Sequence, residues 1–155
     1  RHPPRSTLFP YTTLFRSRDT PFIFLGGPTM CLYSMSAGAS DLLYALRSGH
    51  GYVSFAPGGP EIKMTAGDAM MGDEVEWEIT RQVEINVTGL SAGDEVKVIT
   101  NNGSETLHKA TEDGALQATY LMKTPGFARV EVSRSFLPGL PMLPALISNP
   151  IYFRG

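Results

Sequence analysis

The sequence Ser40–Phe55, SDLLYALRSGHGYVSF, decides how the rest of the chain is interpreted. Its leucines recur at spacings of three and four residues, which places them on one face of a helix: Leu42, Leu43 and Leu46. Ser40 is suited to cap the first turn, and Gly49 is suited to end the helix in a left-handed conformation. After Gly49 the pattern changes to a period of two. The stretch therefore predicts a short helix, a glycine stop and a strand.

The residues before this stretch indicate an incomplete α/β unit. Thr29–Tyr33, TMCLY, is apolar on both faces, which is typical of a strand in a parallel sheet. A small-residue loop then leads to the predicted helix. One strand and one short helix cannot form a stable structure alone, because both faces of such a strand need cover. We therefore expect residues 18–50 to be one leftover β–α unit of a larger structure.

The residues from Gly51 onward predict a β domain. Short runs with alternating apolar residues, such as Val83/Ile85/Val87 and Val96/Val98, are separated by turn sequences rich in Gly, Pro, Asn and Asp. Asn102-Gly103 is a strong hairpin signal. We expect strands near residues 51–56, 60–65, 74–80, 82–88, 95–100, 105–110, 115–122, 126–135 and 145–153. This spacing predicts an immunoglobulin-like antiparallel β-sandwich over residues 51–155, with Trp77 as its central core residue.

One segment of this β domain does not fit a central strand. Leu137–Pro144, LPGLPMLP, carries three prolines, and proline has no N–H to donate to a neighbouring strand. We therefore predict a loop here that crosses between the two sheets before the final strand.

The first residues are foreign to the rest. Thr7–Ser17, TLFPYTTLFRS, matches the translation of a common sequencing-library adapter without a mismatch. We therefore interpret residues 1–17 as adapter-derived, expect them to be disordered, and exclude them from reasoning about the fold. We expect the natural protein to be truncated near Arg18. Three segments result: residues 1–17, the β–α unit at 18–50 and the β-sandwich at 51–155.

Composition excludes some classes of function. The 155 residues are 42% hydrophobic and 18% charged, which fits a globular chain. The formal net charge of −2 and the scattered Lys and Arg residues argue against nucleic-acid binding. No apolar run approaches the length of a membrane span, so we expect no membrane partner. Cys31 is the only cysteine, which excludes an internal disulfide, and we expect it to be a buried small hydrophobic residue.

No complete catalytic or metal-binding set can be assembled from the sequence. His50 and His108 are far apart and lack the spacing of metal ligands, so we expect a polar turn residue and a solvated strand residue. Three acids flank turns but lack the alternating pattern of a calcium loop, so we expect solvated side chains: Asp68, Asp73 and Glu74. Gly26-Gly27-Pro28 precedes no immediate helix, which argues against a phosphate-binding loop. We therefore expect no catalytic, cofactor-binding or metal-binding residue here.

Three segments together resemble one family. Residues 27–33, GPTMCLY, are similar to a late strand of the domain found in PHP (polymerase and histidinol phosphatase) proteins. Residues 41–54, DLLYALRSGHGYVS, look like the helix-to-strand exit from its barrel, and residues 148–153, SNPIYF, resemble the closing strand of its C-terminal β domain. Their order and spacing match the CehA/McbA-like metallohydrolases. The resemblance covers nearly all of residues 25–155, although residues 60–145 match only as a β-rich pattern.

The resemblance implies a parent enzyme with a (β/α)-type metal barrel that hydrolyses ester or phosphoester bonds. In that family His, Asp and Glu side chains hold divalent metals (Zn, Mn or Fe), which activate water. Those ligands lie upstream, where this chain carries the adapter; Asp19 is the only acid left nearby, with no histidine beside it. The resemblance therefore implies a truncated, non-catalytic C-terminal part with no cofactor of its own. Its expected partner is the missing N-terminal barrel, and its exposed remnant is open to self-association.

A different class of function stays open. The chain could be a stand-alone β-sandwich that binds carbohydrate or protein, in which case one sheet face should carry an exposed aromatic row. Four residues are candidates, although the alternation places most of them inside: Tyr120, Phe127, Phe136 and Tyr152.

Overall fold

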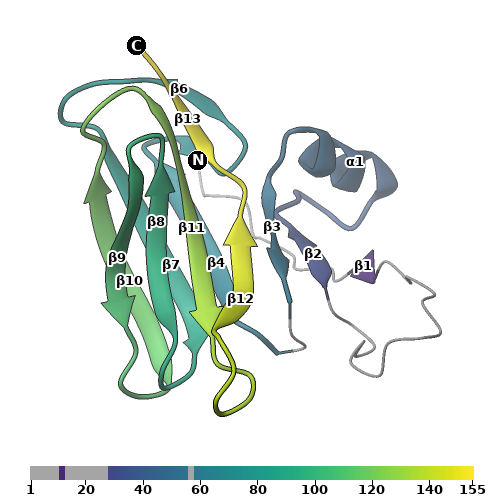
Figure 1. Ribbon diagram of the computed structural model, residues 1–155. Helices are drawn as coiled ribbons and strands as arrows, with labels where there is room; N and C mark the ends of the chain where they lie inside the picture. The colour runs from purple at the N-terminus through teal and green to yellow at the C-terminus, as the bar shows by residue number, and fades with distance from the viewer. Residues whose placement is uncertain (1–10, 13–27, 56–57) are drawn as a thin grey trace.

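Two β-sheets and one short helix make up the part of the chain that the structure, a computed structural model, describes: residues 11–12, 28–55 and 58–155. Figure 1 shows the two sheets as neighbouring layers, with the helix α1 (Ala39–Arg47) to one side of them. Asp19 and Gly26-Gly27, which are discussed above, lie outside the described residues. Of the adapter-derived segment, only Tyr11–Thr12 is described, and it pairs with residues 29–30 as the short strand β1.

The larger sheet is built around one long strand, β11. Its order is β1 (Tyr11–Thr12), β2 (Thr29–Leu32), β3 (Gly51–Ser54), β12 (Leu143–Ser148), β11 (Gly126–Arg134), β13 (Ile151–Arg154) and β6 (Glu74–Glu76). On its other side β11 pairs with β8 (Glu95–Thr100), which pairs with β9 (Gly103–Lys109). Every pairing is antiparallel except that of β13 with β6. The last strands of the chain therefore lie between the β2–β3 pair and the rest of the sheet.

The smaller sheet supplies the second wall of the core. Its order is β10 (Gly114–Leu121), β7 (Gln82–Leu90), β4 (Glu61–Ala66) and β5 (Ala69–Met70), all antiparallel. The predicted alternation is confirmed, because inward side chains of both sheets join one buried cluster that includes Ile62, Met64, Val83, Ile85, Val87, Val96, Val98, Val130 and Val132. Burying such side chains contributes about 1.5–3 kcal/mol each, which makes this cluster the main source of stability.

The predicted hairpin is confirmed, with a different turn. Thr100 of β8 pairs with Gly103 of β9, so Asn101 and Asn102 form the two-residue connection. The left-handed backbone falls on Gly103, with φ of 120°, because glycine has no Cβ to clash there. The asparagines keep negative φ values.

Two predictions about residues 74–80 are wrong. The strand ends at Glu76, and the side chain of Ile79 is 75% exposed. Trp77 lies half-buried at the margin of the core rather than at its centre, and its Nε1 donates a hydrogen bond to the carbonyl of Met122 at 3.2 Å. The indole N–H needs a partner when it is buried, and at the margin of the core the Met122 carbonyl supplies one.

The proline-rich segment also differs from its prediction. It connects β11 with β12, which are antiparallel neighbours in one sheet, so it does not cross between sheets. Pro144 lies inside β12, where it pairs with Ser133 next to a register irregularity. Such an irregularity can accommodate the missing N–H of proline. The predicted final strand is divided at Asn149-Pro150 into β12 and β13.

The strand β2 is antiparallel to β3, so the expectation of a parallel-sheet strand is wrong. Its burial pattern is also incomplete, because Met30 is 37% exposed. The backbone N–H of Tyr33 bonds to the carbonyl of His50 at 2.8 Å and closes the β2–α1–β3 segment into a loop. After β2 and α1 the chain therefore returns to the same end of the sheet, and β3 runs in the opposite direction to β2.

The helix α1 is present, but its start and its buried face differ from the prediction. Its N-cap is Gly38, so Ser40 lies inside the first turn and does not cap it. The buried side chains are Leu42 and Ala45, whereas Leu43 and Leu46 are 51% and 48% exposed. The predicted C-terminal stop is confirmed, because Gly49 has a φ of 71°.

Candidate functional site

The turn after α1 contains a histidine–aspartate pair that the sequence did not indicate. His50 Nε2 lies 2.7 Å from Asp73 Oδ1, and the two side chains are 14% and 34% exposed. The other Asp73 oxygen accepts a hydrogen bond from the backbone N–H of Met70 at 2.9 Å. His50 is a polar turn residue, as predicted, but it is paired with Asp73, and both oxygens of Asp73 have protein partners rather than solvent alone. No local signal could have found this pair, because 23 residues separate its members.

The contacts around the His50–Asp73 pair hold two loops together and do not orient a reacting group. Tyr44 packs its ring edge against His50, with the centroids 5.9 Å apart. A catalytic triad needs a nucleophile within hydrogen-bond reach of the base. The contacts described for the His50 side chain are with an aspartate and a tyrosine ring, so the pair connects the α1–β3 turn to the β5–β6 loop.

The same junction contains close backbone contacts. Asn149 Nδ2 donates to the carbonyl of Gly49 at 2.8 Å, and its backbone N–H bonds to the carbonyl of Gly51 at 3.1 Å. The N–H of Gly72 bonds to the carbonyl of Pro150 at 2.7 Å. A Cβ on Gly72 would lie 2.0 Å from the carbonyl oxygen of Ser48. Three loops, at residues 48–51, 71–73 and 149–151, therefore meet in direct contact, and we call this the three-loop junction.

Cys31 belongs to a buried aromatic cluster. Tyr33 and Tyr52 pack with ring centroids 6.3 Å apart, and the Tyr33 hydroxyl donates to the carbonyl of Ile62 at 2.5 Å. Burial raises the pKa of the Cys31 thiol and of Tyr52, and it raises the pKa of Tyr33 to about 12. A raised pKa keeps the thiol protonated and unreactive. The prediction that Cys31 is a buried small hydrophobic residue is confirmed.

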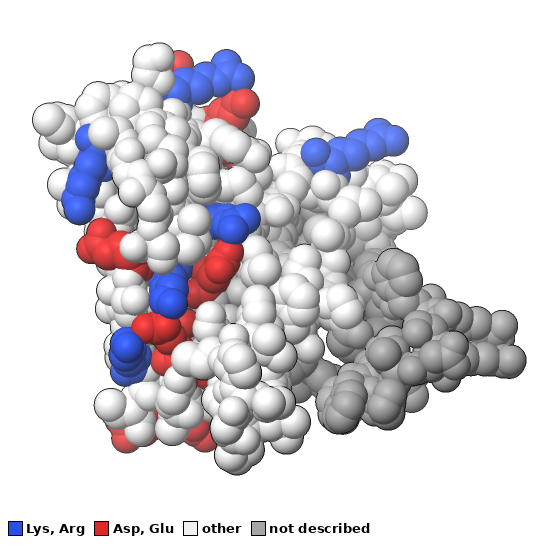
Figure 2. Space-filling model, viewed as in Figure 1, with Lys and Arg blue, Asp and Glu red and all other residues white. Residues whose placement is uncertain are grey.

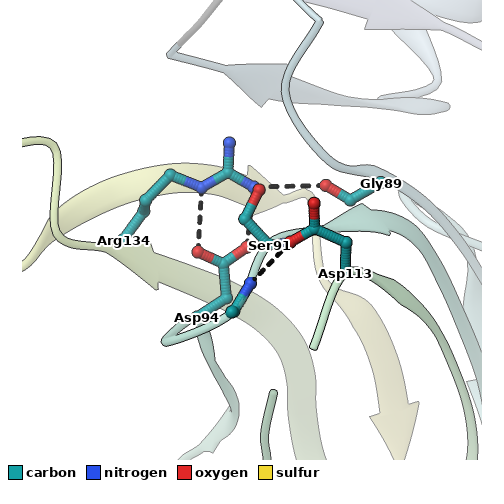
Figure 3. Close-up of polar contacts among 6 residues, drawn as sticks. Gly89, Ser91, Asp94, Asp113 and Arg134 are labelled. Carbon is teal, nitrogen blue, oxygen red and sulfur yellow. Dashed lines mark hydrogen bonds and ion pairs between the residues drawn. The ribbon is translucent and has the colours of Figure 1, made fainter. Parts of the chain in front are cut away.

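The most buried ion pair lies at the opposite end of the molecule. Asp94 is fully buried and accepts two hydrogen bonds from the Arg134 guanidinium, at 2.8 and 2.7 Å. It also accepts a bond from the backbone N–H of Ser91, while Arg134 reaches the carbonyl of Gly89 (Figure 3). The carboxylate raises the pKa of Arg134 further. The hydrogen-bond partners described for Asp94 and Arg134 all belong to this chain. The pair therefore joins the β7–β8 turn to the end of β11.

The outer face of the smaller sheet carries a shallow polar depression of about 310 Å³. Side chains of β7 and β10 line it, in the register pairs Glu84–Thr119 and Asn86–Gln117. The lining offers a carboxylate, two amides and a hydroxyl, but no aromatic ring. It could hydrogen-bond to a small polar molecule.

The remaining predicted residues are scattered. His108 is half-buried on β9 opposite Val96, Asp68 is exposed in its turn, and Glu74 pairs with Arg154. Within residues 11–12, 28–55 and 58–155, no three His, Cys, Asp or Glu residues are grouped as a metal site. In the same ranges, no helix is long and apolar enough to cross a membrane.

The four aromatic candidates do not form one row. Tyr120 packs against the core, Phe136 lies in the β11–β12 loop, and Phe127 and Tyr152 face each other across β11 and β13. Of these, Phe136 and Tyr152 are 40% and 44% exposed.

Charge is distributed unevenly over the surface. On the face of the molecule seen in Figure 2, most charged side chains lie over the β-sheet part, and the surface around α1 is largely uncharged. Several large apolar side chains are exposed on and next to α1: Met30, Met35, Leu43, Tyr44 and Leu46.

Comparisons with known proteins add no family. No family model matches the chain, and no curated protein or solved structure is significantly similar to it.

Proposed function

We propose that residues 18–155 are the C-terminal, non-catalytic part of a PHP-type metal-dependent hydrolase. Residues 18–50 would then be the last unit of its barrel, and residues 51–155 an accessory domain with the form of an immunoglobulin-like β-sandwich. The intact parent would hydrolyse ester or phosphoester bonds on divalent metals held by its upstream barrel. The accessory domain braces that barrel.

The observation that carries this proposal is the contact of Asn149 with Gly49. These residues belong to two of the three segments that resemble the PHP proteins, and 100 residues separate them in the sequence. The Asn149 side chain donates a hydrogen bond to the carbonyl of Gly49 in the turn that ends α1, in addition to the bond from the backbone N–H of Gly51. The β2–β3 pair and the closing strands are also one continuous sheet. An accessory domain that braces a barrel requires such a rigid connection.

The exposed face of α1 supports the same proposal. Leu43, Tyr44 and Leu46 are 48–64% exposed on a helix of nine residues, and Met35, in the loop before that helix, is 71% exposed. A helix of this length depends on tertiary packing for its stability. Large apolar side chains grouped on one helix face are typical of a surface that another part of a protein covers. In the proposed parent, the preceding barrel units cover this face.

The proposal makes a direct prediction for the 155-residue chain. After dialysis against a metal buffer, elemental analysis should find far less than one Zn, Mn or Fe per chain. The chain should not hydrolyse aryl esters or phosphodiesters above the rate of buffer alone. A stoichiometric metal together with hydrolysis would contradict the proposal.

The upstream sequence supplies the decisive control. Resequencing the source locus before the codon of Arg18 should extend the reading frame into metal-binding motifs rich in His and Asp. A start codon or signal sequence immediately before Arg18 would contradict the proposal and favour an independent binding module.

The polar depression on β7 and β10 favours a second candidate, a module that binds carbohydrate or protein. Glu84, Asn86, Gln117 and Thr119 supply hydrogen-bonding groups of the kind that sugars need. The absence of an aromatic ring among these lining residues argues against strong sugar binding. Titration with simple mono- and disaccharides, followed by NMR shifts of the Asn86 and Gln117 side-chain amides, would detect such binding. Gln117→Ala should abolish any shift that arises in the depression.

A further inference from the structure

The loop between β11 and β12 exposes an unusual density of apolar side chains. We call Ser135–Met142 the Leu-Pro loop. Phe136, Leu137, Leu140 and Met142 are 40–56% exposed, and Leu143 at the start of β12 is 53% exposed. Figure 1 shows the loop projecting at one end of the molecule. Leaving so many large apolar groups in water is unfavourable unless another surface covers them.

The tip of the Leu-Pro loop is a rigid turn. The N–H of Leu140 bonds to the carbonyl of Leu137 at 3.2 Å, and the residues between them are Pro138 and Gly139. Proline followed by a glycine with φ of 82° is the pattern of a type II β-turn. A preformed turn loses little conformational freedom when it binds, which favours docking.

The backbone of the loop is also suited to burial. Prolines at positions 138, 141 and 144 lack an N–H, so the segment has few donors to remove from water. The Leu137 carbonyl already accepts bonds from the N–H of Leu140 and from the hydroxyl of Ser135. A buried, unpaired polar group is costly, and this composition keeps that cost small.

The charge pattern indicates what kind of surface fits the loop. The sequence contains no charged residue between Arg134 and Arg154. Arg134 itself is occupied by the buried Asp94, which anchors the base of the loop. The matching surface should therefore be apolar and uncharged, because a charge opposite this loop would be desolvated without a partner.

The position of the loop indicates where that surface lies in the chain. Thr29, Ser54 and Leu146 are successive register partners across β2, β3 and β12. The polypeptide that enters β2 therefore arrives at the same end of the sheet as the loop, and Thr29 lies roughly 10 Å from Leu146 of β12, at two strand spacings. Phe55, which is 38% exposed, lies between them and bonds to the carbonyl of Ala145 at 3.0 Å.

We propose that the Leu-Pro loop is a docking surface for an apolar, uncharged face of the polypeptide that precedes β2 in the natural protein. This inference rests on the proposed function, in which that polypeptide is the metal barrel. The loop and Phe55 together form an apolar end that the barrel covers, in addition to its contact with α1.

The test compares amide hydrogen exchange in two proteins. One is the 155-residue chain, and the other is the complete natural protein with its own upstream sequence in place of residues 1–17. In the complete protein the amide hydrogens of Gly139 and Met142 should exchange at least about ten times more slowly, because docking excludes water from them. Equal exchange in both proteins would overturn the inference.

A pair of variants of the complete protein sharpens the test. Replacing Leu137 and Leu140 with Ser keeps the turn residues Pro138 and Gly139, and should restore fast exchange at the loop. Ile79→Ser, at a 75% exposed position outside the loop, should leave the protection unchanged. Protection that survives the double replacement would overturn the inference.

Two further outcomes separate the inference from the proposed function. A complete protein that binds metal but leaves the loop unprotected contradicts only the docking. A complete protein that has no metal-binding barrel contradicts the proposed function, whatever the loop does. Protection that appears in the 155-residue chain as its concentration rises would identify a second copy as the occupant and overturn the inference.

Discussion

At the scale of single residues, Arg134 and Asp94 are the side chains whose contacts depend most on each other. Asp94 is fully buried, and the planar guanidinium fits both of its oxygens. A buried carboxylate that loses its cation keeps its desolvation cost without compensation. The pair therefore holds the β7–β8 turn against β11, and removing either residue should destabilise the folded chain.

We expect Arg134→Met to destabilise the chain by about 3–5 kcal/mol, because it leaves the buried Asp94 carboxylate without its cation. Urea denaturation followed by circular dichroism measures this change. Arg154→Met is the matched control, because Arg154 pairs with Glu74 on the surface and such pairs contribute about 0–1 kcal/mol. Similar losses in both variants would contradict the role assigned to Asp94.

The buried Tyr33 hydroxyl predicts a loss of stability in alkali. Burial first, and then the charge of Glu61, raise its pKa from 10 to about 12 in the folded chain. The unfolded state therefore loses this proton near pH 10 while the folded state still holds it. The contribution of Tyr33 to the free energy of unfolding should be unchanged below pH 10 and should fall as the pH rises from about 10 to 12.

Tyr33→Phe checks this expectation. The variant loses the hydrogen bond to the Ile62 carbonyl, so it should be less stable at neutral pH by about 1 kcal/mol. Its stability should nevertheless fall less steeply between pH 10 and 12 than that of the original chain. Urea denaturation at several pH values measures both quantities, and an unchanged slope would contradict the assignment.

At the scale of elements, the three-loop junction holds the turn between α1 and β3 against the loops at residues 71–73 and 149–151. Gly72 and Gly93 both have left-handed backbones, with φ of 95° and 92°. A Cβ at Gly93 would meet open space, but one at Gly72 would overlap the backbone of Ser48 and Gly49. Replacing Gly93 with Ala therefore introduces backbone strain alone, whereas replacing Gly72 with Ala introduces backbone strain and a steric clash.

We expect Gly93→Ala to cost about 1–2 kcal/mol, the typical strain of a left-handed residue with a Cβ. Gly72→Ala should cost more, about 3 kcal/mol or above, because the loops must also move apart. Thermal unfolding of the two variants measures the difference. Equal effects would show that the loops at 48–51 and 71–73 can separate freely.

At the scale of the whole molecule, two exposed apolar surfaces are separate features. One is the face of α1, and the other is the Leu-Pro loop. On the face seen in Figure 2, the charged side chains lie mainly over the β-sheet part of the molecule, away from α1. A surface of this kind favours association with another protein surface.

We expect the 155-residue chain to self-associate through the α1 face as its concentration rises. Replacing Leu43 and Leu46 with Ser should weaken this association about tenfold or more, because less apolar area is then buried between copies. Sedimentation equilibrium measures the dissociation constant. Ile79→Ser, which changes an exposed residue elsewhere, should leave it unchanged, and a monomer at all concentrations would contradict the prediction.

The sequence by itself determined most of the strands, because a period of two and the glycine turns are local properties. The runs at β7, β8 and β11 and the stop at Gly49 follow from side-chain alternation and backbone freedom. Only the tertiary structure decided the pairing of β2 with β3 and which face of α1 is buried. It also decided that the proline-rich segment connects neighbouring strands, and that Trp77 lies at the margin. These features depend on contacts between residues far apart in the chain, as with His50 and Asp73, and no local pattern encodes such contacts.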